Sequence, residues 1–151
     1  MLADMYSVLD VARYVIVRSN RAGAISNLKL QKVLYFIQAE FLVVQNMPCF
    51  AEQIEAWDFG PVVPVVYYRY RIYGGAAIPL LQDDGFCPFN KRDKKLADGV
   101  IDECAKYSAA GLTDIVHRQT PWREAYRRRD IITNESLKEF FKENENGRTY
   151  I

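Results

Sequence analysis

The chain has 151 residues, half of them hydrophobic and 26% charged, and its formal net charge is +1. This composition is that of a globular protein rather than a disordered one, and the near-zero charge gives no overall attraction to nucleic acid or to an anionic membrane. Ten tyrosines and eight phenylalanines favour a large core or a protein interface. The length predicts one domain over residues 1–151, with its core at about 6–141.

Cysteine usage and the N-terminal sequence indicate the cellular compartment. Cys49, Cys87 and Cys104 form no C-x-x-C pair, which argues against a disulfide framework and a structural zinc site. The start MLADMYSVLD lacks the basic and apolar regions of a signal peptide, and no run of 18 apolar residues predicts a membrane span. We therefore expect a cytoplasmic protein with no membrane partner, no metal and no cofactor.

The first two predicted helices cover about 7–20, ended through Gly23, and the segment that follows Ser26 or Asn27. The apolar residues of the second helix recur at helical spacing and form its buried stripe: Leu30, Val33, Leu34, Ile37, Phe41 and Val44. Its polar residues fall outside that stripe, so they are predicted to lie on exposed flanks.

Residues 49–74 predict a small β-hairpin followed by a third helix. The segment CFAEQIEAWDF can form two short strands around Glu52–Gln53. Pro61 and Pro64 are compatible with a helix only in its first turn, so they are interpreted as start signals. The helix VVYYRYRIY then ends at Gly74.

The second half of the chain predicts a long loop over residues 75–90 and a helix over about 91–107. Two short helices follow, separated at Pro121, with Thr120 as the cap of the second. Thr133 or Asn134 caps a last helix. The predicted fold is mainly α: a single compact helical domain of about five to seven helices with a small β-hairpin.

Catalytic chemistry finds little support in the sequence. His117 is the only histidine and is a candidate base beside Asp114 or Glu124, but a histidine packed near Trp122 is the favoured interpretation. No nucleophile or metal partner stands at a recognised spacing. Adjacent acidic residues are interpreted as solvated faces. We therefore predict no catalytic residue and no enzyme activity.

Two segments are basic, KRDKK at 91–95 and WREAYRRRD at 122–130. A nucleic-acid backbone would accept such residues, but overall neutrality favours solvated helix faces. The acidic surface of a protein partner could also use the arginines. Nucleic acid is therefore the less favoured partner.

The third predicted helix is apolar or aromatic on nearly every side. Val65, Tyr68 and Ile72 share one face, and Val66, Tyr70 and Tyr73 share another. Such a helix is either central in the domain or half of an interface, and both alternatives stay open. Mixed tyrosine and arginine are typical of interface hot spots, and the interface could serve a homodimer or a different protein.

Three segments together resemble one known family, the SocA-like or Panacea antitoxin domain, to which GepA-type phage-associated proteins also belong. They are NLKLQKVLYFIQAEFLV, IEAWDFGPVVPVVYYRYRIYG and LTDIVHRQTPWREA, and the resemblance extends from about Tyr6 to Phe141. The family positions are Lys29, Leu30, Gln31, Lys32, Tyr35, Glu55, Trp57, Gly60, Pro61, Val62, Pro64, Tyr67, His117, Pro121 and Trp122.

The resemblance implies a mainly helical domain with a β-hairpin and a non-catalytic function. Its members look like antitoxins that neutralise toxins encoded by an adjacent gene, and some look like adaptors or prophage-associated regulators that present a partner to a protease. The predicted partner-binding residues are Lys29, Gln31, Lys32, Tyr35, Tyr67, Arg69, Tyr70 and Arg71. The predicted structural residues are Leu30, Glu55, Trp57, Gly60, Pro61, Pro64, His117, Pro121 and Trp122.

Overall fold

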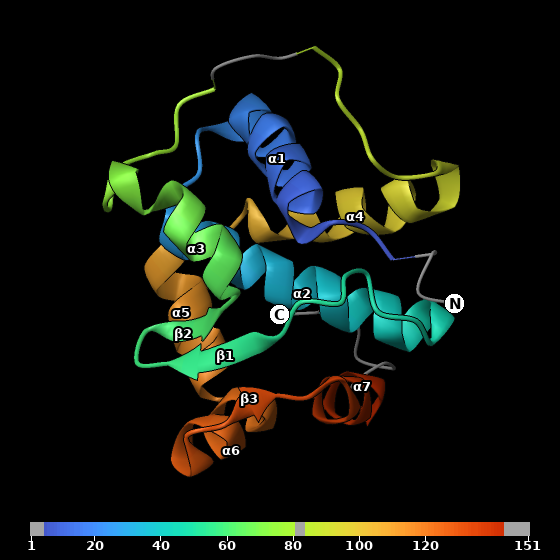
Figure 1. Ribbon diagram of the computed structural model, residues 1–151, viewed down its shortest axis with the longest axis vertical. Helices are drawn as coiled ribbons and strands as arrows, with labels where there is room; N and C mark the ends of the chain where they lie inside the picture. The colour runs from blue at the N-terminus through green and yellow to red at the C-terminus, as the bar shows by residue number, and fades with distance from the viewer. Residues whose placement is uncertain (1–4, 81–83, 144–151) are drawn as a thin grey trace.

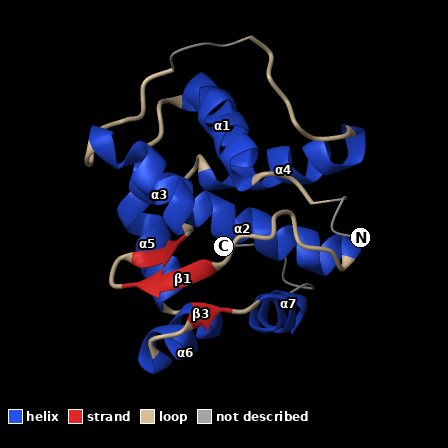
Figure 2. Ribbon diagram, in the orientation of Figure 1, coloured by secondary structure: helices blue, strands red, loops and turns tan. Residues whose placement is uncertain are grey.

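The computed structural model describes residues 5–80 and 84–143, and within these ranges it is mainly helical (Figures 1 and 2). The elements in chain order are α1 (Val8–Ser19), α2 (Asn27–Gln45), β1 (Ile54–Trp57), β2 (Gly60–Val62), α3 (Pro64–Tyr70), α4 (Lys91–Cys104), α5 (Ala109–His117), α6 (Thr120–Arg128), β3 (Ile131–Ile132) and α7 (Asn134–Glu143). The predicted fold class is confirmed. In the part of the chain that is described, no helix is long and apolar enough to cross a membrane.

Helix α2 runs through the middle of the molecule (Figure 1) and packs against α1, α3, α4, α5, α7 and β2. It begins as predicted at Ser26, whose side-chain oxygen accepts a hydrogen bond from the Lys29 amide at 3.2 Å. All residues from Leu30 to Leu42 are buried. The prediction of exposed polar flanks is therefore wrong for this part of the helix, because neighbours surround it. The prediction that Val44 belongs to the buried stripe is also wrong, since Val44 is 45% exposed near the end of the helix.

A three-stranded antiparallel sheet with the order β2-β1-β3 extends the predicted hairpin. Glu55 on the central strand pairs with Val62 on one side and with Ile131 on the other. The predicted turn at Glu52–Gln53 is wrong, since the turn lies at residues 58–59, directly after Trp57. Strand β3 has only two residues, too few to show a period-2 pattern in the sequence.

Helix α3 begins at Pro64, as predicted for a first-turn proline, and continues into a 3-10 helix at Arg71–Tyr73. Gly74 ends it with a φ of +58°, a conformation that glycine adopts without steric cost. Only Val66 of α3 is buried. Because so little of this short helix is used for the core, its other side chains are free to form a surface.

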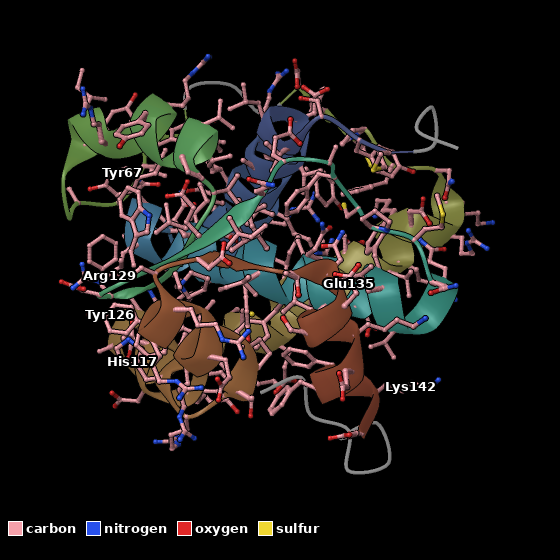
Figure 3. All side chains as sticks on the ribbon, turned by 60° about the horizontal axis from the view of Figure 1, so that its bottom comes forward. Tyr67, His117, Tyr126, Arg129, Glu135 and Lys142 are labelled. Carbon is pink, nitrogen blue, oxygen red and sulfur yellow. The ribbon has the colours of Figure 1, made fainter. Side chains whose placement is uncertain are left out.

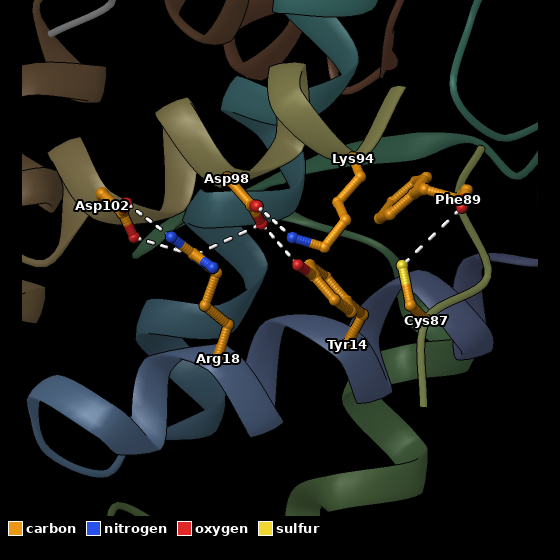
Figure 4. A network of polar contacts seen from close by, with 7 residues as sticks. All are labelled: Tyr14, Arg18, Cys87, Phe89, Lys94, Asp98 and Asp102. Atoms are coloured by element: carbon orange, nitrogen blue, oxygen red, sulfur yellow. Dashed lines mark hydrogen bonds and ion pairs between the residues drawn. The ribbon is translucent and has the colours of Figure 1, made fainter. Parts of the chain in front are cut away.

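A polar seam holds α1 against α4 (Figure 4). The Tyr14 hydroxyl donates a hydrogen bond to Asp98 at 2.5 Å, and Lys94 contacts the other oxygen of the same carboxylate at 2.8 Å. Arg18 bridges Asp98 at 3.3 Å and Asp102 at 2.8 Å. Its hydrogen bond lowers the pKa of Asp102. These charge-assisted contacts fix the position of α4, which ends at Cys104, earlier than predicted.

The last three helices follow the predicted order. Pro121 lies in the first turn of α6, but the N-cap residue is Gln119 and not Thr120. At α7 the prediction is confirmed, because the Thr133 hydroxyl accepts a hydrogen bond from the Ser136 amide at 3.1 Å. Helix α7 packs against α2. In this way α7 helps to cover the buried part of α2, from Leu30 to Leu42.

Candidate partner-binding surface

Buried polar side chains of α2 hold the start of α3 in place. The Gln31 side-chain oxygen accepts a hydrogen bond from the Val63 amide at 2.9 Å, and its nitrogen donates to the Asn27 side chain at 2.8 Å. Asn27 in turn donates to the Tyr67 carbonyl at 3.0 Å. Gln31 was predicted to contact a partner from an exposed flank, but it is fully buried. Its observed contacts position the helix that carries Tyr67.

Gln31→Leu is expected to lower the free energy of unfolding by about 1–3 kcal/mol, because the buried Val63 amide loses the acceptor that Gln31 provides. Leucine keeps the volume of the side chain, so the loss reports the hydrogen bond rather than a cavity. Chemical denaturation measures the effect, with exposed Gln53→Leu as the matched control. An unchanged unfolding midpoint for Gln31→Leu would contradict this role.

Lys29 and Tyr35 also contact other elements of the chain. The Lys29 ammonium donates to the Tyr107 carbonyl at 2.6 Å, after the end of α4. The Tyr35 hydroxyl donates to the Gln119 side chain at 2.8 Å, at the start of α6. Burial raises the pKa of Tyr35 and lowers the pKa of Lys29. Tyr35 is fully buried, so its predicted exposure is wrong, and Lys29 is half-buried.

Lys32 is the least expected of these residues, because its charged side chain is fully buried. Its ammonium donates to the Leu28 carbonyl at 3.2 Å and forms no ion pair with any described residue. Desolvation lowers its pKa to about 8. The side chain fills the space beside Gly60, where a Cβ would lie 3.2 Å from Lys32 Cε. A partner cannot reach Lys32 while the fold stays as described.

The hairpin and α3 bring together a group of aromatic rings, of which Tyr68 is exposed and Trp57, Phe59 and Tyr67 are half-buried. Trp57 packs edge-on against Tyr67 with ring centroids 5.0 Å apart and lies 6.4 Å from Tyr68. Arg71 lies over the Tyr68 ring at 5.1 Å. The rings and their exposed neighbours form the aromatic surface, which consists of Trp57, Phe59, Val65, Tyr67, Tyr68, Arg71 and Ile72.

Three large hydrophobic residues of the aromatic surface are strongly exposed. Ile72 has 83% of its surface accessible, Tyr68 has 53% and Val65 has 44%. Isolated exposed apolar residues are common, but a contiguous group of them marks an interaction site. The predicted residues Tyr67 and Arg71 lie in this group. Phe59, Val65, Tyr68 and Ile72 were missed as candidates, although the shared face of Val65, Tyr68 and Ile72 was visible in their spacing.

Helices α5 and α6 support the aromatic surface from behind. The Trp122 indole donates to the Trp57 carbonyl at 2.9 Å, and the Trp57 indole donates to Glu55 at 2.8 Å. Trp122 itself is buried between two other rings, 4.1 Å from His117 and 4.6 Å from Tyr126. Figure 3 shows Tyr67, Tyr126 and His117 along one side of the molecule. The predicted structural roles of Trp57 and Trp122 fit these contacts.

His117 does not have the surroundings of a catalytic base. Its ring packs against Trp122, and its Nε2 is buried without a hydrogen-bond partner among the described residues. No hydrogen bond joins it to Asp114 or Glu124. A hollow of about 770 Å³ lies next to Trp57 and is lined by Tyr126 and Arg129 but not by His117. Within residues 5–80 and 84–143, no group of acidic, histidine and cysteine side chains could hold a metal ion.

Two other residues predicted to be structural, Leu30 and Pro61, are buried. The interpretation of Pro61 as a helix start signal is wrong, because it stands in β2, an edge strand, where the missing amide donor is tolerated. Arg69 and Tyr70 line a separate hollow beside α1. The predicted partner-binding residues of α2 are thus buried, except for half-buried Lys29. The other four lie on α3 and the 3-10 helix after it, and they are exposed or half-buried.

Comparison with known proteins assigns the chain to a family. The family described as "Antitoxin SocA-like, Panacea domain" matches residues 30–123. A curated relative, "Antitoxin SocA" of Caulobacter vibrioides (strain NA1000 / CB15N), is 58% identical over 121 residues. The chain therefore belongs to the SocA-like, Panacea-domain family, and the resemblance in the sequence is confirmed.

The match with the relative covers 73% of this chain and 61% of the relative. The chain thus spans less than two thirds of that protein's length. No solved structure matches this chain. The aromatic surface falls inside the residues matched by the family, since α3 and the hairpin lie between residues 54 and 74.

Proposed function

We propose that this protein is an antitoxin that neutralises a protein toxin by binding it directly through the aromatic surface. Family membership supports the antitoxin role, and the name of the relative points in the same direction. The observation that carries the choice of surface is the exposure of Val65, Tyr68 and Ile72 beside the packed, half-buried rings of Trp57 and Tyr67. Tyrosine, tryptophan and arginine are the residues enriched in interface hot spots.

Binding without catalysis fits the arrangement of the candidate site. The backbone that carries the rings is held by α2 and α6, through the hydrogen bonds to the Tyr67 and Trp57 carbonyls. The rings also pack against one another, so less side-chain freedom is lost when a partner covers them. A standard interface buries about 1,200–2,000 Å² in total, and the aromatic surface with its surroundings offers a starting point for such an area. We expect the toxin to be encoded by an adjacent gene.

Co-expression with the adjacent reading frame tests the proposal. That frame is expressed alone and then together with this protein, and growth is followed. Arrest that this protein relieves, together with a purified complex of the two proteins, is the expected result. Arrest without relief, or no arrest, would contradict the proposed function. If the partner disappears only in cells with an active protease, the protein is instead an adaptor.

Val65→Glu is expected to abolish relief of growth arrest and to raise the Kd of the complex by about tenfold or more, because it places a charge in the apolar contact. The matched control is Val44→Glu on α2, since Val44 is 45% exposed and Val65 44%. Calorimetric titration and circular dichroism compare the two variants. Equal affinity for both variants, with both folded, would show that the toxin binds elsewhere.

A further inference from the structure

A second hollow, of about 530 Å³, lies between α1 and the far flank of α3. Its lining mixes polar and apolar surface, and Ile16 of α1 and Ile78 of the loop after the 3-10 helix form an apolar floor. Tyr70 and Tyr73 add half-buried rings. We name it the α1–α3 hollow. It shares α3 with the aromatic surface, so a partner that covers this helix can reach both sites.

The charged residues that the structure describes in the lining of the α1–α3 hollow are of one sign. They are Arg13 and Arg69, and none of the described lining residues is acidic. Arg13 has a partner at the rim, Asp84 at 3.0 Å, and lies 4.1 Å from the centre of the Phe86 ring. Arg69 is exposed and forms no ion pair with another described residue. The guanidinium group of Arg13 is thus held in place, and that of Arg69 is available to pair with a ligand.

Tyr70 lines the same hollow as the two arginines. Burial raises the pKa of its hydroxyl, and the charges of Arg69 and Arg13 both oppose that rise. Because Arg13 is paired with Asp84, a carboxylate in this hollow would pair with Arg69 and accept a hydrogen bond from the Tyr70 hydroxyl. Such charge-assisted hydrogen bonds are stronger than neutral ones.

We infer that the α1–α3 hollow binds a segment of the partner protein in which an apolar side chain is flanked by acidic residues. The apolar side chain fills the floor beside Ile16 and Ile78, and a carboxylate pairs with Arg69. The apolar floor disfavours a nucleic-acid backbone, which offers phosphates but no side chain of this kind. The inference rests on the proposed function, because it states which part of the toxin meets α3.

A titration with short peptides tests this inference without the toxin. The probes are an acetylated, amidated pentapeptide Glu-Phe-Glu-Leu-Glu and the matched Lys-Phe-Lys-Leu-Lys, added to the ¹⁵N-labelled full chain. We expect the acidic peptide to shift the amide signals of residues 13–17 and 69–78, and the basic peptide to leave them unchanged. Arg69→Glu should weaken the acidic peptide by about tenfold or more, and the control Arg123→Glu, an exposed arginine of α6, should not.

Other outcomes overturn the inference. They are an absence of shifts, equal shifts with both peptides, shifts confined to other regions, or retained binding in Arg69→Glu. Stronger shifts from a single-stranded oligonucleotide would assign the hollow to nucleic acid instead. The proposed function fails separately, when wild-type protein does not relieve growth arrest, so a negative result in one experiment does not obscure the other.

Discussion

Gly60→Val is expected to lower the free energy of unfolding by several kcal/mol, enough to unfold a domain of ordinary stability. Gly60 has a φ of +122°, and a β-branched residue is strained there by about 1–3 kcal/mol. The added Cβ would also lie 3.2 Å from Cε and 3.4 Å from Nζ of buried Lys32. Such overpacking costs a further ~1–3 kcal/mol.

Chemical denaturation of both glycine variants measures this effect. The matched control is Gly75→Val, because nothing lies within 4 Å of a Cβ at Gly75, so that variant should keep the stability of the wild type. Repeating Gly60→Val on a Lys32→Ala background separates the two causes, since only the steric part is relieved when the long side chain is removed. Wild-type stability of Gly60→Val would refute the close fit between Lys32 and β2.

Lys32→Met is expected to stabilise the protein by about 3 kcal/mol at pH 7, which is the free energy that corresponds to a pKa of about 8 instead of 10.5. Methionine has a similar length but no charge to desolvate. The unfolded chain holds the proton more tightly than the folded one. The penalty on the wild type is therefore complete below pH 8 and disappears as the pH rises to about 10.5.

Denaturation of wild type and Lys32→Met at several pH values between 7 and about 10.5 measures this penalty. The difference in unfolding free energy should shrink steadily across this range. Exposed Lys95→Met serves as the control and should change stability by less than about 0.5 kcal/mol at each pH. A less stable Lys32→Met variant, or a difference that does not depend on pH, would contradict the picture of an uncompensated buried cation. A stabilised variant that no longer relieves growth arrest would show that the lysine is kept for function.

Most helices were predictable because their periodicity and their caps are local features of the sequence. Ser26, Pro64 and Gly74 mark boundaries that the structure confirms. The hairpin turn was misplaced because the strands are only three or four residues long. The turn occupies residues 58–59, and strand β2 begins at Gly60, which has a positive φ and pairs with Trp57. Strand β3 pairs with β1 across more than 70 residues of sequence, and no local pattern predicts such a partner.

The candidate site shows where reasoning from polarity fails. Gln31 and Lys32 were predicted on exposed flanks because polar side chains usually avoid the core. In this fold the central helix has neighbours on all sides from Leu30 to Leu42. Gln31 therefore accepts a hydrogen bond from the Val63 amide, and Lys32 fills the space beside Gly60. For the third helix the sequence left two alternatives open, a central place in the domain or a place in an interface. The exposure of Tyr68 and Ile72 favours the interface.

The hydrogen bond between the two tryptophans has a practical consequence. Both indoles of the chain belong to the same region, Trp57 in the aromatic surface and Trp122 directly behind it. Tryptophan fluorescence depends on the polarity and the quenchers around the ring, so a partner that covers the hairpin should change the emission of the unlabelled protein. The molecule thus has an intrinsic optical reporter at its proposed binding surface, and stopped-flow mixing can follow complex formation without any added dye.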